Sequence, residues 1–404
     1  MTNTKKQNIE EMSVQEQLQE LERQLNGKYI NRRDIVRSLI VTLLANGNMV
    51  MLGPAGTAKT DIVQTLSKCI NSKYFETLLT RLSPPEELFG PISIKELEEG
   101  RFARVTENSL ATADIGFIDE CFKGSSETLN SMLGVLAQRV FRNGTASPEQ
   151  IPLTLTVGAS NEMPEGGAEG DLAALWDRFE VRHITEYIKD DRSFLQLLTM
   201  DSSCEPNIRI ALDDVKFAQK ASRQVDVSPI LPNLVKLWKD LRQANISVSD
   251  RKFRNCLKYL KANAYLDGRY ECEPADIAFL ANMFWDTPDK IKEVRKIVMK
   301  ANSDDMAKAQ DIFDSASDLY NELVMLPSND ESIKDKYGKS KSQVITEYHG
   351  KITKAKAQLE TIQHKLQKAG KNTRIVDGWL EDTNRMFIAV CQYLTNVNTT
   401  LETI

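Results

Sequence analysis

The sequence predicts an α/β domain with a mainly parallel sheet, followed by an all-α domain and a C-terminal helical bundle. In the first half, short apolar runs that read as buried strands each lead into helical or loop sequence. This order is typical of parallel strands covered by helices on both faces. No strand signal appears between residues 205 and 287. Beyond Asp289, apolar residues recur at steps of three and four, which indicates long helices packed as in a coiled coil.

Length and composition agree with several folded, soluble domains. The chain has 404 residues, of which 41% are hydrophobic and 27% charged, and a single ordinary domain is shorter than this. We expect an N-terminal helix over residues 1–30, the α/β domain over 31–200, the helical domain over 201–288 and the bundle over 289–404.

No export signal or membrane segment is predicted. The N-terminus is polar, and the longest apolar run, residues 38–45, is too short to span a membrane. The six cysteines are scattered without a Cys-x-x-Cys pair, which favours reduced, buried thiols in the cytoplasm. The three histidines are not at ligand spacing, so a metal cage of protein side chains is not expected.

The α/β domain opens with a predicted helix over residues 32–47 and a buried strand over residues 48–52. A glycine-bearing loop follows, and then a helix from residue 60 to about residue 70. Two further buried strands are predicted over residues 115–119 and 153–160. A strand, a glycine-rich loop and a helix in this order are the context that a phosphate-binding loop requires.

The loop GPAGTAKT, residues 53–60, has the residue types that bind a polyphosphate. Its glycines allow a tight turn, Lys59 supplies a cation for the β- and γ-phosphates, and the Thr60 hydroxyl would hold Mg²⁺. The usual pattern has glycine where this chain has Ala58, and we expect little cost if φ of Ala58 is negative. The predicted nucleotide-binding residues are Gly53, Pro54, Ala55, Gly56, Thr57, Ala58, Lys59, Thr60 and Asp61.

Polar side chains at the ends of the next two predicted strands complete the candidate site. Asp119 would hold the metal through water, and Glu120 would polarise the attacking water. Asn161 would bind the γ-phosphate or orient the water without adding negative charge. The structural alternatives are a strand-end turn with solvated acids and an asparagine that only forms a turn. Together with the loop, these residues favour Mg-dependent nucleotide hydrolysis.

Three long helices are predicted at about residues 290–326, 333–369 and 373–404. Apolar residues keep the alternating spacing in the second and third helices, where Thr383 is the one polar member, while Asp305 interrupts the first. Such a repeat favours an antiparallel three-helix bundle. The alternative is that single helices pack separately on the α/β domain.

Four stretches in this order resemble the AAA+ ATPases, and more narrowly the MoxR family: MLGPAGTAKT, IGFIDE, VGASNE and ALWDRFEVR. Members of that family commonly carry a non-glycine residue before the lysine of the loop. Residues 80–110 and the stretch VSDRKF are most similar to the RavA subgroup. The resemblance covers about residues 20–285. It implies Walker A at the loop, Walker B at Asp119 and Glu120, and sensor 1 at Asn161.

The resemblance also implies roles for arginines. Arg178, in WDRF, would be the finger that reaches the nucleotide of a neighbouring subunit, and Arg182 is a nearby rival. Arg251, in SDRK, would be sensor 2 and contact the γ-phosphate of its own subunit, so that phosphate loss changes the angle between domains. For each arginine the structural alternative is a surface ion pair.

Two segments resemble insertions of this family and are predicted to form hairpins. Residues 90–110 alternate apolar and polar side chains around Glu99-Gly100, and residues 137–157 carry an Asn143-Gly144 turn. Both segments would contact the substrate, or serve only as structural hairpins.

The stretch PPEELFGP, residues 84–91, is interpreted as a rigid connection that seats the first insert, because paired prolines fix φ and stop helices. We expect no catalytic role for Glu86 or Glu87.

The function implied by the resemblance is hydrolysis of ATP with Mg²⁺ in a homo-oligomeric ring, a hexamer, that remodels or matures a protein partner like a chaperone. In this family the partner is often a protein with a von Willebrand factor A domain. RavA-type relatives insert a mostly β module in the C-terminal region. No strand-rich segment follows residue 290, so we expect that module to be missing.

Two rival functions stay open. The first is a nucleic-acid-associated NTPase, with ATP or GTP as its nucleotide. The net charge of −5 and the lack of a basic block offer no footprint for nucleic acid, but the inserts carry cations that could supply one. These are Lys95, Arg101, Arg104, Arg139 and Arg142. The second rival is a nucleotide-gated scaffold with incidental turnover.

Overall fold

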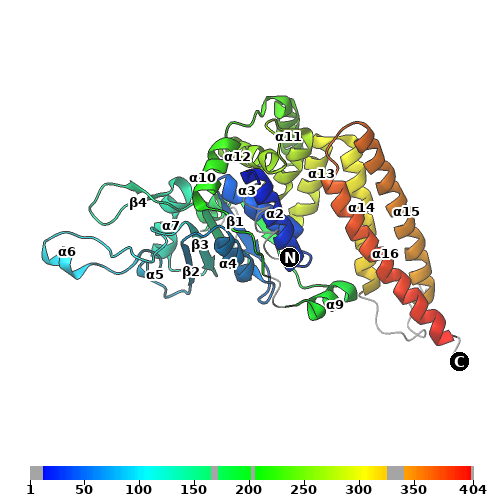
Figure 1. The fold of residues 1–404 in the computed structure, drawn as a ribbon, viewed down its shortest axis with the longest axis horizontal. Helices are drawn as coiled ribbons and strands as arrows, with labels where there is room; N and C mark the ends of the chain where they lie inside the picture. The colour runs from blue at the N-terminus through cyan, green and yellow to red at the C-terminus, as the bar shows by residue number, and fades with distance from the viewer. Residues whose placement is uncertain (1–11, 165–171, 202–204, 325–340, 402–404) are drawn as a thin grey trace. The chain divides into compact units, whose positions relative to one another are not determined.

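The computed structural model describes residues 12–164, 172–201, 205–324 and 341–401. The chain divides into two compact units (Figure 1). The first consists of Met1–Tyr187, Ser202–Pro232 and Leu241–Ile291, and the second of Ile188–Asp201, Asn233–Asp240 and Lys292–Ile404. No helix within the described ranges is long and apolar enough to cross a membrane.

A five-stranded parallel sheet forms the centre of the first unit. Its strands are β1 (Asn48–Leu52), β2 (Tyr74–Leu78), β3 (Ile115–Asp119), β6 (Leu155–Ser160) and β7 (Val181–Ile184). Their order is β2-β3-β6-β1-β7, and every neighbouring pair is parallel. The three predicted strands are therefore confirmed, with the third beginning two residues later than expected. The edge strands β2 and β7 were not predicted.

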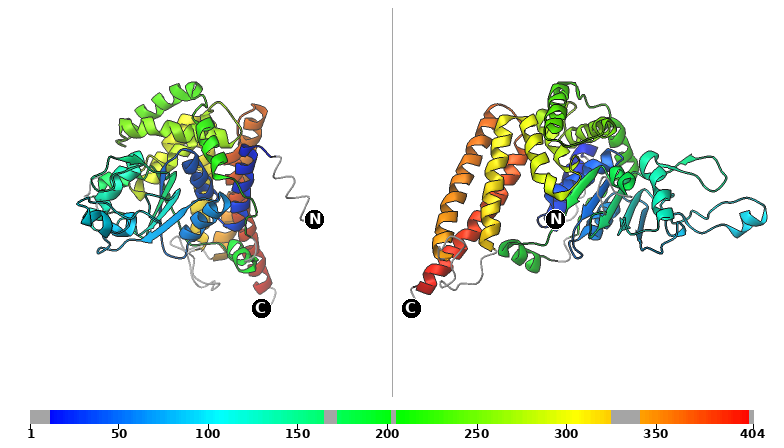
Figure 2. Two further views of the ribbon diagram at one scale, coloured as in Figure 1. Left: turned by 60° about the vertical axis from the view of Figure 1, so that its left-hand side comes forward. Right: turned by 180° about the vertical axis from the view of Figure 1, so that it is seen from behind.

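Helices flank this sheet (Figures 1 and 2). They include α2 (Val14–Lys28), α3 (Arg33–Leu44), α4 (Lys59–Cys69), α7 (Ser126–Gln138) and α8 (Ala173–Arg178). Helix α2 begins at a capping box in which the Ser13 and Glu16 side chains bind each other's backbone N–H groups. The predicted helices before and after the phosphate-binding loop are confirmed as α3 and α4.

Most of the helical segment predicted after the sheet lies in the first unit, whereas Asn233–Asp240 belongs to the second. It contains α10 (Leu212–Ser222), α12 (Asp250–Leu266) and a 3₁₀ segment, η3 (Pro274–Asn282). Helix α12 packs against α2, α3 and α10. Arg37 of α3 fixes this contact, because its guanidinium donates to Asn263 Oδ1 and to the Asp267 carboxylate, at 2.9 and 2.6 Å.

The second unit contains α9 (Asp191–Thr199), α14 (Asp304–Val324), α15 (Lys341–Lys368), α16 (Arg374–Leu401) and nearly all of α13 (Ile291–Asn302). The prediction of a single helix over residues 290–326 is wrong. The chain breaks between α13 and α14 because the Ser303 hydroxyl accepts the Met306 N–H and caps the second helix. The expected start of the next helix at residue 333 lies outside the described residues.

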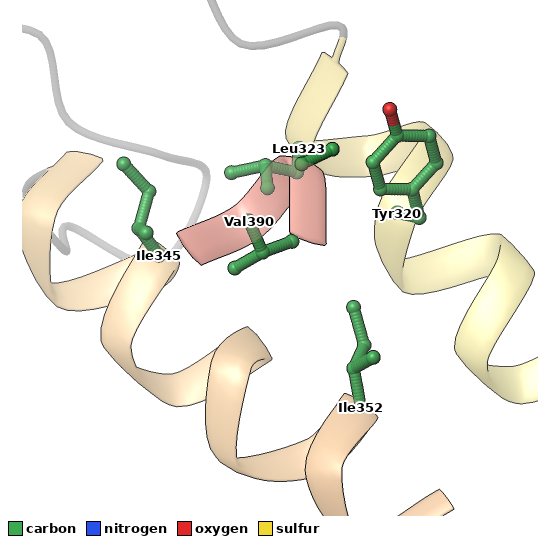
Figure 3. Close-up of a cluster of buried hydrophobic side chains, with 6 residues drawn as sticks. Tyr320, Leu323, Ile345, Ile352 and Val390 are labelled. Atoms are coloured by element: carbon green, nitrogen blue, oxygen red, sulfur yellow. The ribbon is translucent and has the colours of Figure 1, made fainter. Parts of the chain in front are cut away.

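The three-helix bundle is antiparallel, as predicted. Figure 3 shows Leu323 at the end of α14 close to Ile345 at the start of α15 and to Val390 of α16, and all three are buried. At the other end of the bundle, Lys365 Nζ lies 2.8 Å from Asp305 Oδ1. Thr383, the polar member of its apolar row, is buried with its hydroxyl donating to the Trp379 carbonyl at 2.7 Å.

The two inserts extend from the sheet on the same side in Figures 1 and 2. The first holds α6 (Ile94–Glu98), and only an isolated antiparallel bridge joins Ile92 to Arg104. The hairpin predicted there is wrong because Ser93 caps a helical turn instead. The second insert is a hairpin as predicted, formed by β4 (Val140–Phe141) and β5 (Glu149–Gln150).

The two inserts contact each other at the predicted Asn143-Gly144 turn. Asn143 Oδ1 accepts the Arg104 N–H at 2.6 Å, and a Cβ on Gly144 would lie 1.7 Å from the Phe102 carbonyl. The preceding segment seats the first insert, as expected, through α5 (Glu86–Phe89). Glu86 accepts a hydrogen bond from Arg104 at 2.7 Å, which gives this acid a structural role.

Candidate functional site

The phosphate-binding loop lies at the carboxyl edge of the sheet, between β1 and α4. The Gly53 N–H donates to the carbonyl of Ser160, the last residue of β6, at 3.0 Å. Lys59 Nζ donates to the carbonyls of Gly53 and Pro54 at 2.6 and 2.9 Å. The ammonium group is therefore held against the start of its own loop, next to the ends of the central strands.

Ala58 adopts a left-handed conformation with φ of +65°. The condition for little cost, a negative φ, is therefore not met, because α4 begins directly after Ala58 and the preceding turn needs this torsion. A residue with a Cβ loses roughly 1–2 kcal/mol in this region. The loop thus keeps the backbone of a glycine-containing loop while carrying an alanine.

The remaining loop residues have distinct surroundings. Burial lowers the pKa of Lys59, and the negative charges of Asp119 and Glu120 oppose that shift. Thr60 is half-buried in the first turn of α4. Asp61, predicted to bind nucleotide, accepts a 2.6 Å hydrogen bond from Tyr29. That contact ties the end of α2 to α4.

The two acids and the amide predicted from the sequence come together at the same edge. Asp119 ends β3, and its Oδ1 accepts the Glu120 N–H at 3.0 Å. Asn161 Nδ2 donates to Glu120 Oε1 at 2.8 Å, so this amide orients the carboxylate. Glu120 Oε2 is buried and makes no hydrogen bond within the described residues, although Lys123 Nζ lies 3.3 Å away.

These groups fit a magnesium nucleotide. The Glu120 oxygen without a hydrogen bond is suited to accept one from a water molecule. The described residues contain no cluster of three or more His, Cys, Asp or Glu side chains that could cage a metal. Mg²⁺ commonly takes one or two protein ligands and completes its shell with phosphate oxygens and water. Thr60 and Asp119 are the residues that would hold it.

The predicted finger, Arg178, lies at the opposite edge of the sheet. Its carbonyl accepts a 2.9 Å hydrogen bond from Asn48, the first residue of β1. The loop follows Leu52 at the other end of that strand, about 13 Å away at roughly 3.3 Å per residue. The Arg178 side chain is 23% exposed and lies 3.7 Å from Asp177. Within this subunit it does not reach the loop.

Arg251 lies at the same amino edge, in the first turn of α12, where its guanidinium is paired with Asp177. This is not the contact expected of a sensor 2 that binds the γ-phosphate of its own subunit. Asp177 therefore sits between the two arginines to which nucleotide roles were assigned, a feature that the sequence motif did not reveal.

Arg182 is a structural residue. Its side chain is 1% exposed and stacks on the Trp176 ring, with the guanidinium carbon 4.1 Å from the ring centre. It donates to the Trp176 carbonyl and to the Asp286 carboxylate, at 3.0 and 2.6 Å. Burial lowers the pKa of this guanidinium, while Asp286 opposes the shift. A residue enclosed in this way cannot serve a neighbouring subunit, which rules out the rival finger in this conformation.

The insert cations are mostly neutralised or enclosed. Arg139 is buried and donates to the Gly47 carbonyl at 2.7 Å. Arg104 is paired with Glu86, and Arg101 with both Glu96 and Glu99. Of the five cations proposed as a footprint for nucleic acid, Lys95 and Arg142 are exposed and form no ion pair with an acidic side chain in the described part of the chain.

Comparison with known proteins decides the family. Residues 16–219 match the family model described as the MoxR domain in the MoxR-vWA-beta-propeller ternary systems, and residues 229–298 match that of an AAA lid domain. The chain belongs to the MoxR family of AAA+ ATPases. The narrower resemblance to the RavA subgroup stays a prediction.

Relatives of this MoxR protein include two uncharacterized proteins of Methanocaldococcus jannaschii. MJ0079 is 36% identical over 311 residues, which cover 77% of this chain and 81% of the relative. MJ0812 is 32% identical over 366 residues, which cover 90% and 96%. The crystal structure of a candidate ATPase from Cytophaga hutchinsonii is similar, with a TM-score of 0.56, 18% identity and coverage of 71% of this chain and 94% of that one. This last likeness shows the fold alone.

Proposed function

We propose that this MoxR protein hydrolyses ATP at the carboxyl edge of its sheet. The observation that carries the proposal is the Glu120 carboxylate, which Asn161 holds at 2.8 Å and whose charge acts on Lys59 of the loop. A base, a cation and a phosphate-binding loop at one sheet edge are the parts that phosphoryl transfer to water requires.

Each residue has a separate task in this proposal. The loop N–H groups and Lys59 bind the β- and γ-phosphates. Glu120 accepts the proton of the attacking water, and Asn161 keeps the carboxylate pointed at that water. Thr60 and Asp119 hold Mg²⁺, which when bound neutralises charge on the phosphates. The Lys59 ammonium must leave the Gly53 and Pro54 carbonyls to engage the nucleotide.

We further propose that the active form is a ring, a hexamer. Arg178 and Arg251 both lie at the amino edge, and a subunit placed against that edge would bring its own phosphate-binding loop to them. Arg178 then acts as the finger for the neighbour's nucleotide. Arg251 would contact the same nucleotide of the neighbouring subunit. The sequence had led us to expect that Arg251 contacts the nucleotide of its own subunit. We also propose that the domains of each subunit are divided as the sequence predicts, at residues 30, 200 and 288.

The proposed client is a protein. The matched family description names MoxR domains that occur with von Willebrand factor A and β-propeller proteins, so we propose such a von Willebrand factor A protein as the partner to be remodelled or matured in the cytoplasm. The two inserts are the proposed contact elements. The described residues after 290 contain no strand, so a mechanism that depends on a β module there is not proposed.

The nucleic-acid alternative is less well supported, because three of its five insert cations are paired or buried. Hydrolysis that is stimulated by DNA or RNA, and that falls steeply as salt rises, would favour it over a protein client.

Mixing two inactive variants tests the proposed ring. Arg178→Ala should bind ATP and lose hydrolysis, since fingers contribute about 10³–10⁵ in rate. Glu120→Gln should also bind ATP without turnover. Mixed together they should regain activity, because an Arg178→Ala subunit receives the finger of a Glu120→Gln neighbour. The exposed Arg223→Ala serves as the matched control and should hydrolyse ATP alone. If the mixture stays as inactive as its components, Arg178 does not act between subunits.

A further inference from the structure

Two side chains outside the known motifs bind carbonyl groups of the phosphate-binding loop. The Tyr187 hydroxyl donates to the Ala55 carbonyl at 3.0 Å. Arg32 Nε donates to the Thr57 carbonyl at 3.4 Å, and Arg32 Nη2 donates to the Glu186 carbonyl at 2.6 Å. Arg32 precedes α3 and Tyr187 follows β7, so segments far apart in the sequence meet on one side of the loop.

The held carbonyls determine where two N–H groups point. In a trans peptide the carbonyl and the following N–H point in opposite directions, and no described peptide is cis. The Ala55 carbonyl shares its peptide with the Gly56 N–H, and the Thr57 carbonyl shares its peptide with the Ala58 N–H. A donor on either carbonyl therefore turns the adjoining N–H to the opposite side of the loop.

Thr185 brings the chain close enough for these contacts. Its N–H donates to the Leu52 carbonyl at 2.6 Å, and its hydroxyl lies 3.0 Å from the Thr57 hydroxyl. A Cβ on Gly53 would lie 2.1 Å from the Thr185 carbonyl, so only glycine permits this approach. Residues 185–187 thus run directly along the loop before the chain enters the second unit at Ile188.

We propose that Tyr187 and Arg32 are positioning residues that fix the N–H groups of Gly56 and Ala58 toward the polyphosphate. The proposal rests on the proposed function of this loop as the ATP site. It also accounts for the persistence of the left-handed Ala58, since a strained backbone needs support from its surroundings. The Arg32 contact is made to the peptide directly preceding Ala58.

Tyr187→Phe gives the sharpest test, because it removes one hydroxyl and keeps the ring. The loop N–H groups hold phosphate in the ground state and in the transition state alike, so KM should rise while kcat stays within about twofold. A neutral hydrogen bond corresponds to a rise of about fivefold in the Kd for ATP. Tyr187 is 61% exposed, so the melting temperature should not change.

Three ligands separate a phosphate effect from a nucleobase effect. ATP, GTP and inorganic tripolyphosphate should all lose affinity for Tyr187→Phe by the same factor, because the loop binds the shared phosphates. Tyr270→Phe is the matched control, since this tyrosine is 67% exposed and its hydroxyl contacts Gln15 at 3.4 Å. It should bind all three ligands as the wild type does.

Arg32 supplies an independent test by conservative replacement. Arg32→Met should weaken tripolyphosphate binding, and Arg32→Lys should restore part of the affinity because it keeps the positive charge but lacks the separate Nε and Nη2 donors of the guanidinium. Unchanged Kd values in Tyr187→Phe, or a loss confined to ATP and absent for tripolyphosphate, would overturn the positioning role. Wild-type protein that binds these ligands but never hydrolyses ATP would instead contradict the proposed function and leave this inference standing.

Discussion

At the scale of single residues, Ala58 combines a common loop geometry with an uncommon side chain. Its φ of +65° lies where a Cβ approaches the following carbonyl oxygen. The neighbouring Ala55 is in the same loop without a positive φ. The two alanines therefore offer the same chemical change in two backbone conformations.

Ala58→Gly should stabilise the folded protein by about 1 kcal/mol. Glycine removes strain of roughly 1–2 kcal/mol, and its greater freedom in the unfolded chain offsets about half of that. Ala55→Gly lacks the strain and should be destabilising or neutral. Urea unfolding of both variants checks the difference. Equal loss of stability in both would show that Ala58 is not strained.

For single residues, the sequence predicted the chemical roles better than it predicted the conformations and surroundings of the side chains. Lys59, Glu120 and Asn161 were found because each follows a recognisable strand or loop, and the parallel sheet brings them to one edge. The burial of Arg182 could not be predicted, since it depends on Trp285 and Asp286, about a hundred residues away in the chain.

At the scale of elements, the central strands were predictable and the edge strands were not. β1, β3 and β6 are almost wholly buried and consist mainly of apolar residues. β2 is largely half-exposed, and β7 includes Arg182 and His183. Charged and polar residues interrupt the apolar pattern of both strands, so neither was predicted from the sequence. Thr185, Glu186 and Tyr187 follow the missed strand β7, so their place beside the loop was missed too.

The contact between α12 and the sheet includes a buried lysine. Lys252 Nζ lies 3.5 Å from Asp286, which also binds Arg182. Burial lowers the pKa of Lys252, the Arg182 charge adds to that shift and Asp286 opposes it, so that the resulting pKa is about 7. Glu180 also opposes it from the strand side. Two cations thus share one carboxylate at this contact.

Removing this lysine should change how stability depends on pH. Lys252 loses its proton near pH 7 when folded and near 10.5 when unfolded. Between these two pH values the unfolded chain therefore binds more protons than the folded one. As a result, Lys252 makes the free energy of unfolding rise with pH, by up to about 1.4 kcal/mol per pH unit. The free energy of unfolding of Lys252→Met should not show this rise with pH.

Urea unfolding of wild type and Lys252→Met at pH 7, 8 and 9 measures the effect as a difference between the two proteins. The same substitution at the exposed Lys220 corrects for the general effect of removing a lysine. If the difference in the free energy of unfolding between wild type and Lys252→Met stays constant from pH 7 to 9, Lys252 remains charged in the folded state.

At the scale of the whole molecule, the sheet separates two sets of side chains that we propose act on the nucleotide. Lys59, Glu120 and Asn161 lie at its carboxyl edge, while Arg178 and Arg251 lie at its amino edge. One subunit therefore cannot bring both sets to a single nucleotide in this conformation. The family motifs named all five residues, and the strand directions support our proposal that a second subunit completes the site.

The Glu120→Gln variant is the sharpest test of whether the carboxyl edge of the sheet hydrolyses ATP. Glutamine keeps the shape and the contact with Asn161 but cannot accept the proton of the attacking water. Phosphate release measured with Mg²⁺ and ATP should show turnover by the wild type. The variant should fall by at least about 100-fold with ATP binding retained. Equal rates in the two proteins, including equal inactivity while ATP still drives assembly, would contradict hydrolysis at this edge and favour a nucleotide-gated scaffold.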